Sequence, residues 1–125
     1  MIAPQGILGI VGHPVGHSLS PALHNWALAG LGLAKAYFRW DICPERLADF
    51  VAAVRTLEIE GVSVTIPHKV MMMDLVDEVT DEARVVGAVN TLYWKEGVLV
   101  GGNTDVSGFL APLERDGRIP ASALV

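Results

Sequence analysis

The sequence has 125 residues, of which 51% are hydrophobic and 18% are charged, so it favours a single folded domain over a disordered chain. Fourteen acidic against nine basic residues give a net charge of -5, which argues against a general nucleic-acid or anionic-membrane surface. No apolar run approaches the ~20 residues of a membrane span. The N-terminus lacks the basic region of a signal peptide, and Cys43 has no second cysteine to pair with. We therefore expect a cytoplasmic protein.

The first half of the chain alternates predicted strands and helices. Residues 6–12 are a short apolar run between glycines, which indicates a buried strand. After a polar loop, Pro21 predicts the start of a helix with Ser20 as its N-cap. The apolar residues of this helix share one face: Leu23, Trp26, Ala27, Gly30 and Leu31.

Two more strands enclose a second helix. Residues 36–43 are strand-like, and Pro44 predicts the start of the helix that follows. Residues 61–66 alternate apolar and polar side chains, which is typical of a strand. The predicted apolar stripe of the intervening helix consists of Leu47, Phe50, Val51, Val54 and Leu57.

The second half is predicted to contain three short helices and a β-hairpin. The helices cover residues 69–76, 81–86 and 106–116, and the hairpin strands cover 89–94 and 98–101. Thr80 and Asp105 are the expected caps of the last two helices. The strand-and-helix rhythm predicts an α/β fold. We expect a three-layer sandwich, with a mixed, mostly parallel sheet and helices on both faces.

Cofactor-phosphate loops and metal sites are not predicted in this chain. Gly30-Leu-Gly32 begins a G-x-G pattern, but it ends a predicted helix instead of opening one. His13 and His17 are four residues apart with a proline and a glycine between them, so they are not expected to share a helical face.

The loop before the first helix has two serines, and their arrangement has two interpretations. Ser18 and Ser20 alternate around Leu19, so both hydroxyls can point toward the helix start, where free N–H groups favour an anion. This arrangement would cradle a carboxylate. The alternative is that Ser20 simply caps the helix and Ser18 faces water. The loop alone leaves both open.

The stretch Ser63-Val-Thr-Ile-Pro-His-Lys69 predicts a second polar position. Side chains alternate along a strand, so Ser63 and Thr65 share the face opposite Val62, Val64 and Ile66. Thr65 is then at the carboxyl end of a parallel strand, where open α/β sheets bind ligands. Lys69 falls in the first turn of the next predicted helix, where a cation is disfavoured. We expect it to lose its proton readily and to work as an acid or base. The alternative is a solvated lysine.

A third polar group lies near the end of the chain. Asp105 in Gly101-Gly-Asn-Thr-Asp-Val-Ser-Gly108 can be a helix cap, or it can be a carboxylate that partners Lys69. Asn90 and Thr91 are a polar pair at the start of a predicted strand.

Together these segments resemble the substrate-binding domain of shikimate dehydrogenases. The matching pieces, in the family's order and close to its spacing, are Gly16-His-Ser-Leu-Ser-Pro-x-x-His-Asn25, Val64-Thr-Ile-Pro-His-Lys69, Gly87-Ala-Val-Asn-Thr91 and Gly102-Asn-Thr-Asp-Val-Ser-Gly-Phe109. The family reduces 3-dehydroshikimate to shikimate with NADPH in aromatic amino-acid biosynthesis. One departure is Ser63, where the family often has asparagine.

The resemblance implies a role for each matching polar residue. Ser18 and Ser20 would hold the substrate carboxylate, while Thr65, Lys69, Asn90 and Asp105 would bind ring hydroxyls. Lys69 and Asp105 would also be the catalytic acid/base pair, with Lys69 moving the proton.

The resemblance also implies a division into domains. Residues 1–117 would be the substrate-binding domain, and residues 118–125 would begin the linker to a Rossmann domain that binds NADP. No cofactor-binding residue is expected in this chain, which alone should be inactive.

Two further readings of function stay open on the sequence. One is an enzyme that uses quinate as substrate or NAD as cofactor. The other is a sensor of shikimate-like acids that does not catalyse a reaction. Small molecules are the expected partners, and oligomeric state is left open, a homodimer being one alternative.

Overall fold

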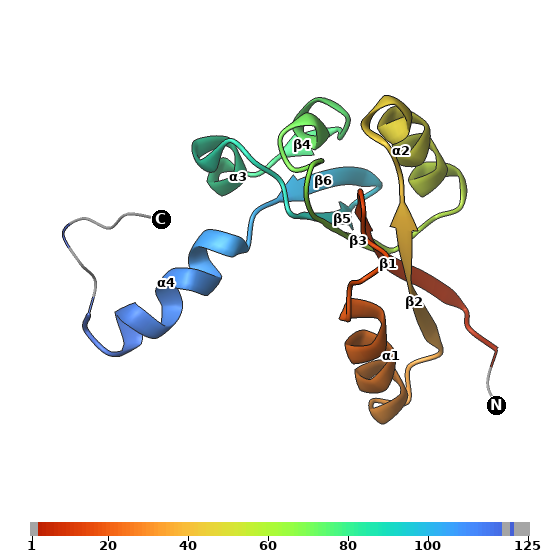
Figure 1. The fold of residues 1–125 in the computed structure, drawn as a ribbon, viewed down its shortest axis with the longest axis horizontal. Helices are drawn as coiled ribbons and strands as arrows, with labels where there is room; N and C mark the ends of the chain where they lie inside the picture. Colours follow the sequence, from red (N-terminus) through yellow and green to blue (C-terminus); the bar gives the residue numbers. More distant parts are fainter. Residues whose placement is uncertain (1–2, 119–120, 122–125) are drawn as a thin grey trace.

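A six-stranded sheet organises the part of the chain that the computed structural model describes, residues 3–118 and residue 121 (Figure 1). The strands are β1 (Gly6–Gly12), β2 (Lys35–Asp41), β3 (Gly61–Val64), β4 (Glu78–Val79), β5 (Thr91–Lys95) and β6 (Val98–Gly102). The α-helices are α1 (Ser20–Gly30), α2 (Leu47–Thr56), α3 (Asp81–Val86) and α4 (Asp105–Arg115), and two short 3-10 helices are η1 (Pro44–Arg46) and η2 (Met71–Asp74).

The strand order is β2-β1-β3-β5-β6-β4, and the sheet is mixed but mostly parallel, as the sequence predicts. Three pairings are parallel, namely β1 with β2, β1 with β3 and β4 with β6. The hairpin strands β5 and β6 supply the antiparallel pairings. Because β5 runs against β3, the start of β5 lies beside the end of β3. Because β6 runs back again, it ends at that same edge.

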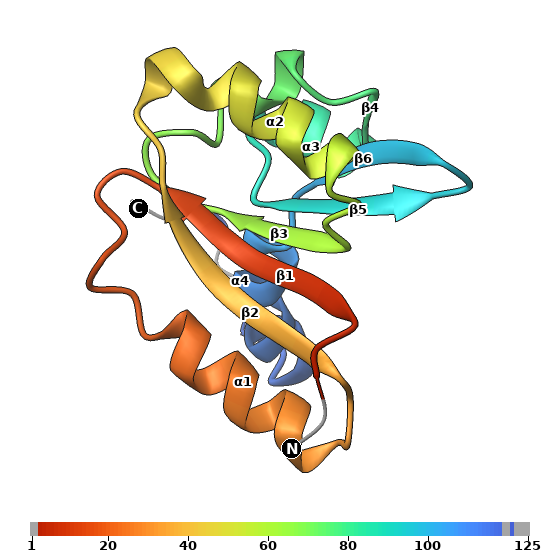
Figure 2. The same cartoon turned by 90° about the vertical axis from the view of Figure 1, so that its right-hand side faces the viewer.

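Helices cover both faces of the sheet, so the predicted three-layer architecture is confirmed (Figures 1 and 2). The larger core lies between the sheet and the α2 and α3 side, and it includes Val11, Leu47, Val54, Met72 and Leu92. A smaller core on the α1 side consists of Ile10, Val15, Leu28 and Tyr37, with Leu8 packed against it. Four residues of the predicted α2 stripe are buried, and only Leu57 is exposed.

The packing face of α1 is not the face that the apolar pattern predicts. Leu23, Trp26 and Leu31 are exposed, Trp26 by 76%, whereas Leu28 is buried. The reason is polar. The Asn25 side chain donates a hydrogen bond to the carbonyl of Tyr37 and accepts one from its N–H, both at 2.9 Å. This pair of hydrogen bonds to β2 holds the side of the helix that carries Asn25 and Leu28 against the sheet.

Some predicted boundaries are wrong in detail. The helix expected over 69–76 is the four-residue 3-10 helix η2, so Lys69 precedes it. β3 ends at Val64, and Ile66 is 73% exposed instead of facing the core. β4 has only two residues, and the sequence analysis does not predict it. No helix within the described residues is long and apolar enough to cross a bilayer. Most of the expected linker, 118–125, lies outside those residues.

Candidate active site at one edge of the sheet

Four polar segments that are far apart in the sequence meet at one edge of the sheet. The ends of β1, β3 and β6 and the start of β5 all lie there, because β6 is parallel to β3 while β5 is antiparallel to both. Backbone hydrogen bonds seal the junction. Val64 N donates to Asn90 O at 2.7 Å, and Asn90 N donates to Gly102 O at 2.9 Å. The predicted site residues all lie on these segments or on the loop after β1.

The loop after β1 is held tightly against the end of β3. His13 N donates to Ile66 O, and Thr65 N donates to Val11 O, both at 3.0 Å. Gly12 permits this approach, since a Cβ atom on it would lie 2.5 Å from Cγ2 of Thr65. The loop that carries Ser18 and the strand end that carries Thr65 are therefore fixed together.

Ser18 and Thr65 line a common cavity of about 340 Å³. Its other lining residues are Ile10, His13, Pro14, Val15, His17 and Ile66. A larger cavity, of about 720 Å³, lies between β2 and α2, but mostly apolar side chains such as Phe38, Trp40 and Phe50 surround it. The smaller cavity is the better candidate, because polar groups from two elements converge on it.

The serine loop differs from the predicted capping scheme. Ser20 is the first residue of α1 and not its cap, and Ser20 N donates to Ser18 Oγ at 3.2 Å. Ser18 is thus the residue that accepts a helix N–H. This bond leaves the hydroxyl proton of Ser18 free to be donated to a ligand. The interpretation in which Ser20 caps the helix is therefore wrong, and the bond that Ser18 makes is compatible with a carboxylate cradle.

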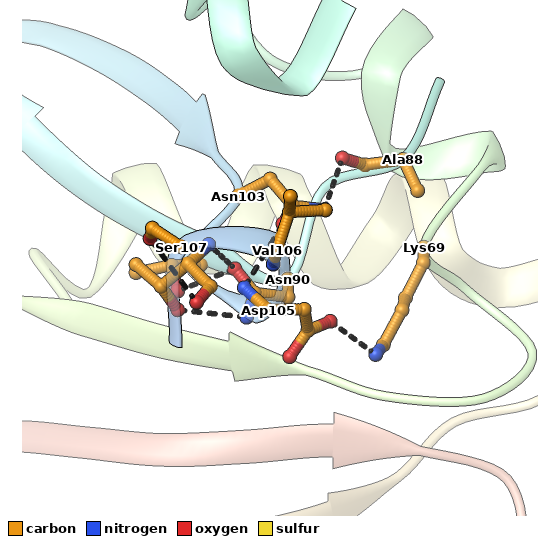
Figure 3. Close-up of polar contacts among 9 residues, drawn as sticks. Lys69, Ala88, Asn90, Asn103, Asp105, Val106 and Ser107 are labelled. Atoms are coloured by element: carbon orange, nitrogen blue, oxygen red, sulfur yellow. Dashed lines mark hydrogen bonds and ion pairs between the residues drawn. The ribbon is translucent and has the colours of Figure 1, made fainter. Parts of the chain in front are cut away.

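Lys69 and Asp105 form the predicted pair. Lys69 Nζ donates to Asp105 Oδ2 at 2.7 Å, and both side chains remain accessible, at 33% and 52% (Figure 3). The hydrogen bond from Lys69 holds the pKa of the Asp105 carboxyl below its usual value, so this group is a carboxylate at neutral pH. The sequence analysis places Lys69 in the first turn of a helix, and this prediction is wrong. Lys69 precedes a four-residue 3-10 helix, so the electric field of a long helix does not act on its amine.

Asn90 holds the corner that leads to Asp105. Its Nδ2 donates to Thr104 Oγ1 at 2.9 Å, and its Oδ1 accepts from Thr104 N at 3.0 Å and from Thr91 Oγ1 at 2.9 Å. The second N–H of the amide is not used in these bonds. Asn90 therefore organises the segment between β6 and α4, and its side chain also helps Lys69 to lower the pKa of the Asp105 carboxyl.

Asn103 is a site residue that the sequence analysis does not single out. Its Oδ1 accepts from the backbone N–H groups of Asp105 and Val106, at 2.9 and 3.3 Å, so Asn103 serves as the cap expected of Asp105 (Figure 3). Asp105 is instead the first residue of α4. The available signal was the Asn-Thr-Asp order before a helix, because asparagine is as good a cap as aspartate.

Ser63 has a partner that the sequence does not reveal. Tyr37 Oη donates to Ser63 Oγ at 2.8 Å, and the His24 ring stacks on Tyr37 with centroids 4.2 Å apart. Burial raises the pKa of the Tyr37 hydroxyl, which keeps it protonated as a donor. The Ser63 side chain, which is shorter than the asparagine that the family often has, thus accepts a hydrogen bond from the Tyr37 hydroxyl on β2.

The remaining histidine, His68, is structural. It is fully buried, and its Nε2 lies 2.7 Å from Ile42 O, which ties the turn before Lys69 to the segment after β2. Within residues 3–118 and 121, no group of three or more His, Cys, Asp or Glu side chains is placed to hold a metal ion.

Fold and site together define a class of protein. An open α/β sheet with a cavity and an ion pair at the carboxyl ends of its strands is typical of a small-molecule-binding domain. The family profile "Shikimate dehydrogenase substrate binding domain" matches residues 10–92. The chain belongs to this family, and the resemblance seen in its motifs is confirmed.

Individual relatives agree with this assignment. The chain is 51% identical over 122 residues to "Shikimate dehydrogenase (NADP(+))" of Oleidesulfovibrio alaskensis, an alignment that covers 98% of the chain and 44% of the relative. The crystal structure of shikimate 5-dehydrogenase of Thermus thermophilus in complex with NADP(H) and shikimate superposes with a TM-score of 0.82 at 44% identity, covering 93% of this chain and 44% of that one. The chain thus spans less than half the length of these relatives.

A structural neighbour with another name has a similar fold. The 5-ketofructose reductase of a Gluconobacter strain superposes with a TM-score of 0.82 at 34% identity, over 88% of this chain and 40% of that one. The substrate must therefore be argued from the site and not from the fold.

Proposed function

We propose that this chain is the substrate-binding and catalytic domain of an NADP-dependent shikimate dehydrogenase, which reduces 3-dehydroshikimate to shikimate in aromatic amino-acid biosynthesis. The observation that carries the proposal is the Lys69–Asp105 ion pair, at 2.7 Å and open to solvent, on the sheet edge that also carries Ser18 and Thr65. The sequence identity to enzymes of that name supports it.

Ser18 and Ser20 bind the substrate carboxylate in this proposal. Ser18 Oγ already accepts the N–H of Ser20, so its own proton is available to the anion. The start of α1 adds a favourable field through the N–H of Ala22, since those of Ser20 and Leu23 are used and Pro21 has none. Thr65 contributes a hydroxyl from the wall of the same cavity. Asn90 contributes its side-chain amide to a ring hydroxyl.

Lys69 is the proton donor to the ketone oxygen. One of its three N–H groups is used by Asp105, which leaves two for the substrate. Asp105 stays ionised, since the bond from Lys69 lowers its pKa, so it orients the amine and compensates its charge. In the reverse direction the neutral amine removes the proton of the alcohol.

The cofactor is assigned to another part of a longer protein. Gly30 and Gly32 end α1 and do not open a helix, so no phosphate-binding loop is formed there. This segment therefore does not fit the phosphates of NADP. In the relatives more than half of the chain lies outside the matched part. NADPH supplies the hydride of the proposed reaction.

The test uses the full-length protein that carries this chain. We expect NADPH-dependent reduction of 3-dehydroshikimate, and Lys69→Ala should lower kcat by about 10²- to 10⁴-fold without unfolding the protein. Lys95→Ala, an exposed lysine at the end of β5, is the matched control and should retain the wild-type rate. Absence of activity in the wild-type protein would refute the proposal, and normal turnover of Lys69→Ala would remove Lys69 from the mechanism.

The same assay separates the alternatives. Quinate oxidation with a specificity constant above that of shikimate, or a preference for NAD, would change the substrate or the cofactor but leave the site intact. Reduction of 5-ketofructose in preference to 3-dehydroshikimate would assign another substrate. Shikimate binding by calorimetry with no turnover under any of these conditions would favour a sensor.

A further inference from the structure

The Lys69–Asp105 pair is part of a ring of four hydrogen bonds that the covalent chain links together, and Figure 3 shows the part formed by Ala88, Asn103, Asp105 and Lys69. From its backbone, Lys69 O accepts from Val89 N at 2.8 Å. The neighbouring Ala88 O accepts from Asn103 Nδ2 at 3.0 Å. Asn103 Oδ1 accepts from Asp105 N at 2.9 Å. The ring closes where Asp105 Oδ2 accepts from Lys69 Nζ at 2.7 Å.

Few contacts among the described residues hold the helix that carries Asp105. In this part of the chain α4 has no buried residue, and Figure 1 shows it extending away from the sheet. Packing within the described residues therefore does not fix the start of this helix. The polar contacts of Asn103 and Asn90 with the segment before α4 must orient the carboxylate.

We propose that Asn103 is a positioning residue for the proton-transfer pair. Its two functional groups act on different partners. The side-chain carbonyl oxygen of Asn103 accepts from the first turn of α4. Its amide nitrogen donates to Ala88 O, and the next residue, Val89, donates its N–H to Lys69 O. Asn103 thereby sets the distance between the Lys69 amine and the Asp105 carboxylate. This inference rests on the proposed function.

Ordinary helix capping is the simpler reading, and it makes a different prediction. A cap needs only an acceptor at position 103, and aspartate supplies one as well as asparagine does. The anchor to Ala88 needs a donor, which aspartate lacks at neutral pH. Asn103→Asp therefore keeps the cap and removes the anchor, whereas Asn103→Ala removes both.

The experiment compares these two variants with a matched control in the full-length protein. Thr80→Ala removes the cap of α3, where Thr80 Oγ1 accepts from Ala83 N at 3.2 Å, without touching the ring. We expect Asn103→Asp and Asn103→Ala to lower kcat about 10²-fold, with KM changed less than threefold, because misplacement of about 1 Å has effects of this size. Thr80→Ala should keep the wild-type kcat.

A second readout needs no substrate. The pKa of the Asp105 carboxyl, followed by NMR, should rise toward its usual value in Asn103→Ala, since the bond from Lys69 that lowers it is loosened. It should not change in Thr80→Ala. Wild-type kcat in Asn103→Asp, or an unchanged Asp105 pKa in Asn103→Ala, would overturn the inference.

These outcomes are distinct from failure of the proposed function. An inactive wild-type protein, or an active Lys69→Ala variant, would refute the reaction while the pKa measurement still tested the ring. An inactive Lys69→Ala beside a fully active Asn103→Asp would refute the positioning role alone.

Discussion

The side chains of Lys69 and Asp105 meet at 2.7 Å in a place that water reaches. Solvent screens such a pair, so its contribution to the free energy of unfolding is small. Its importance is geometric. The carboxylate restrains a long, flexible side chain and leaves two of its N–H groups directed elsewhere. Accessible ion pairs that converge with other polar groups are typical of reactive sites.

The Ser18 hydroxyl accepts the N–H of Ser20, so its own proton is available to a ligand. We predict that Ser18→Ala raises KM for 3-dehydroshikimate about 10- to 100-fold, because a hydrogen bond to a charged group contributes about 1.5–3 kcal/mol. The effect on kcat should be smaller, since the carboxylate is bound in the ground state and the transition state alike.

Steady-state kinetics of the full-length protein make the measurement. Thr56→Ala removes an exposed hydroxyl at the end of α2 and should leave KM unchanged. An unchanged KM in Ser18→Ala would remove this residue from the proposed carboxylate cradle.

Among the elements, β1 and β3 position the cavity. They pair in parallel, and the loop after β1 is hydrogen-bonded to the segment after β3. This close approach is possible because Gly12 has no side chain in the space beside Thr65. The cavity is thus a product of two strand ends and one missing Cβ.

Gly12→Ala should therefore destabilise the protein. The new Cβ would lie 2.5 Å from Thr65 Cγ2, which forces the loop and the strand end apart. We expect a loss of about 1–3 kcal/mol in the free energy of unfolding, together with a higher KM. Urea unfolding and steady-state kinetics check both.

Gly16→Ala is the matched control in the same loop, because nothing lies within 4 Å of its added Cβ. Its free energy of unfolding should stay within about 0.5 kcal/mol of wild type. Equal effects of the two substitutions would show that the contact with Thr65 is not what excludes a side chain at position 12.

At the scale of the whole molecule, stability should depend on acid pH. The pKa values of four carboxyl groups are lowered in the folded state. A hydrogen bond from His13 lowers that of Asp41, and the residue's own backbone N–H lowers that of Glu45. The N–H of Leu99 and then Arg55 lower that of Asp77, and Lys69 lowers that of Asp105. Each carboxylate stabilises the fold above its unfolded pKa of about 4. That contribution is lost as the pH falls through the lower folded value.

We therefore predict that these groups do not change the Tm above about pH 5, and that the Tm falls steeply below about pH 4. Asp77→Asn should flatten this fall, because asparagine can still accept from Leu99 N but has no charge to lose. Asp74→Asn, at an exposed position in η2, is the control. A Tm that is the same at pH 6 and pH 3 would contradict the prediction.

The class of fold and the family follow from the residue patterns and motifs alone, and the same motifs predict the polar residues of the proposed site. Hydrophobic period and glycine or proline boundaries predict β1, β2, α2 and the β5–β6 hairpin, because burial on one face imposes a period on the chain. The four motifs also predict the Lys69–Asp105 pair, which the structure places in contact.

How these residues meet depends on the arrangement of the strands in the folded sheet. The reversed direction of β5 brings Asn90 and Asn103 to the edge where β3 ends, and no local pattern encodes strand direction within a sheet. The anchor of Asn103 to Ala88, the inward side of α1 and the partner of Ser63 all depend on hydrogen bonds between distant segments. Such bonds are set by the packed arrangement of the whole sheet, so they cannot be read from the residues of one element.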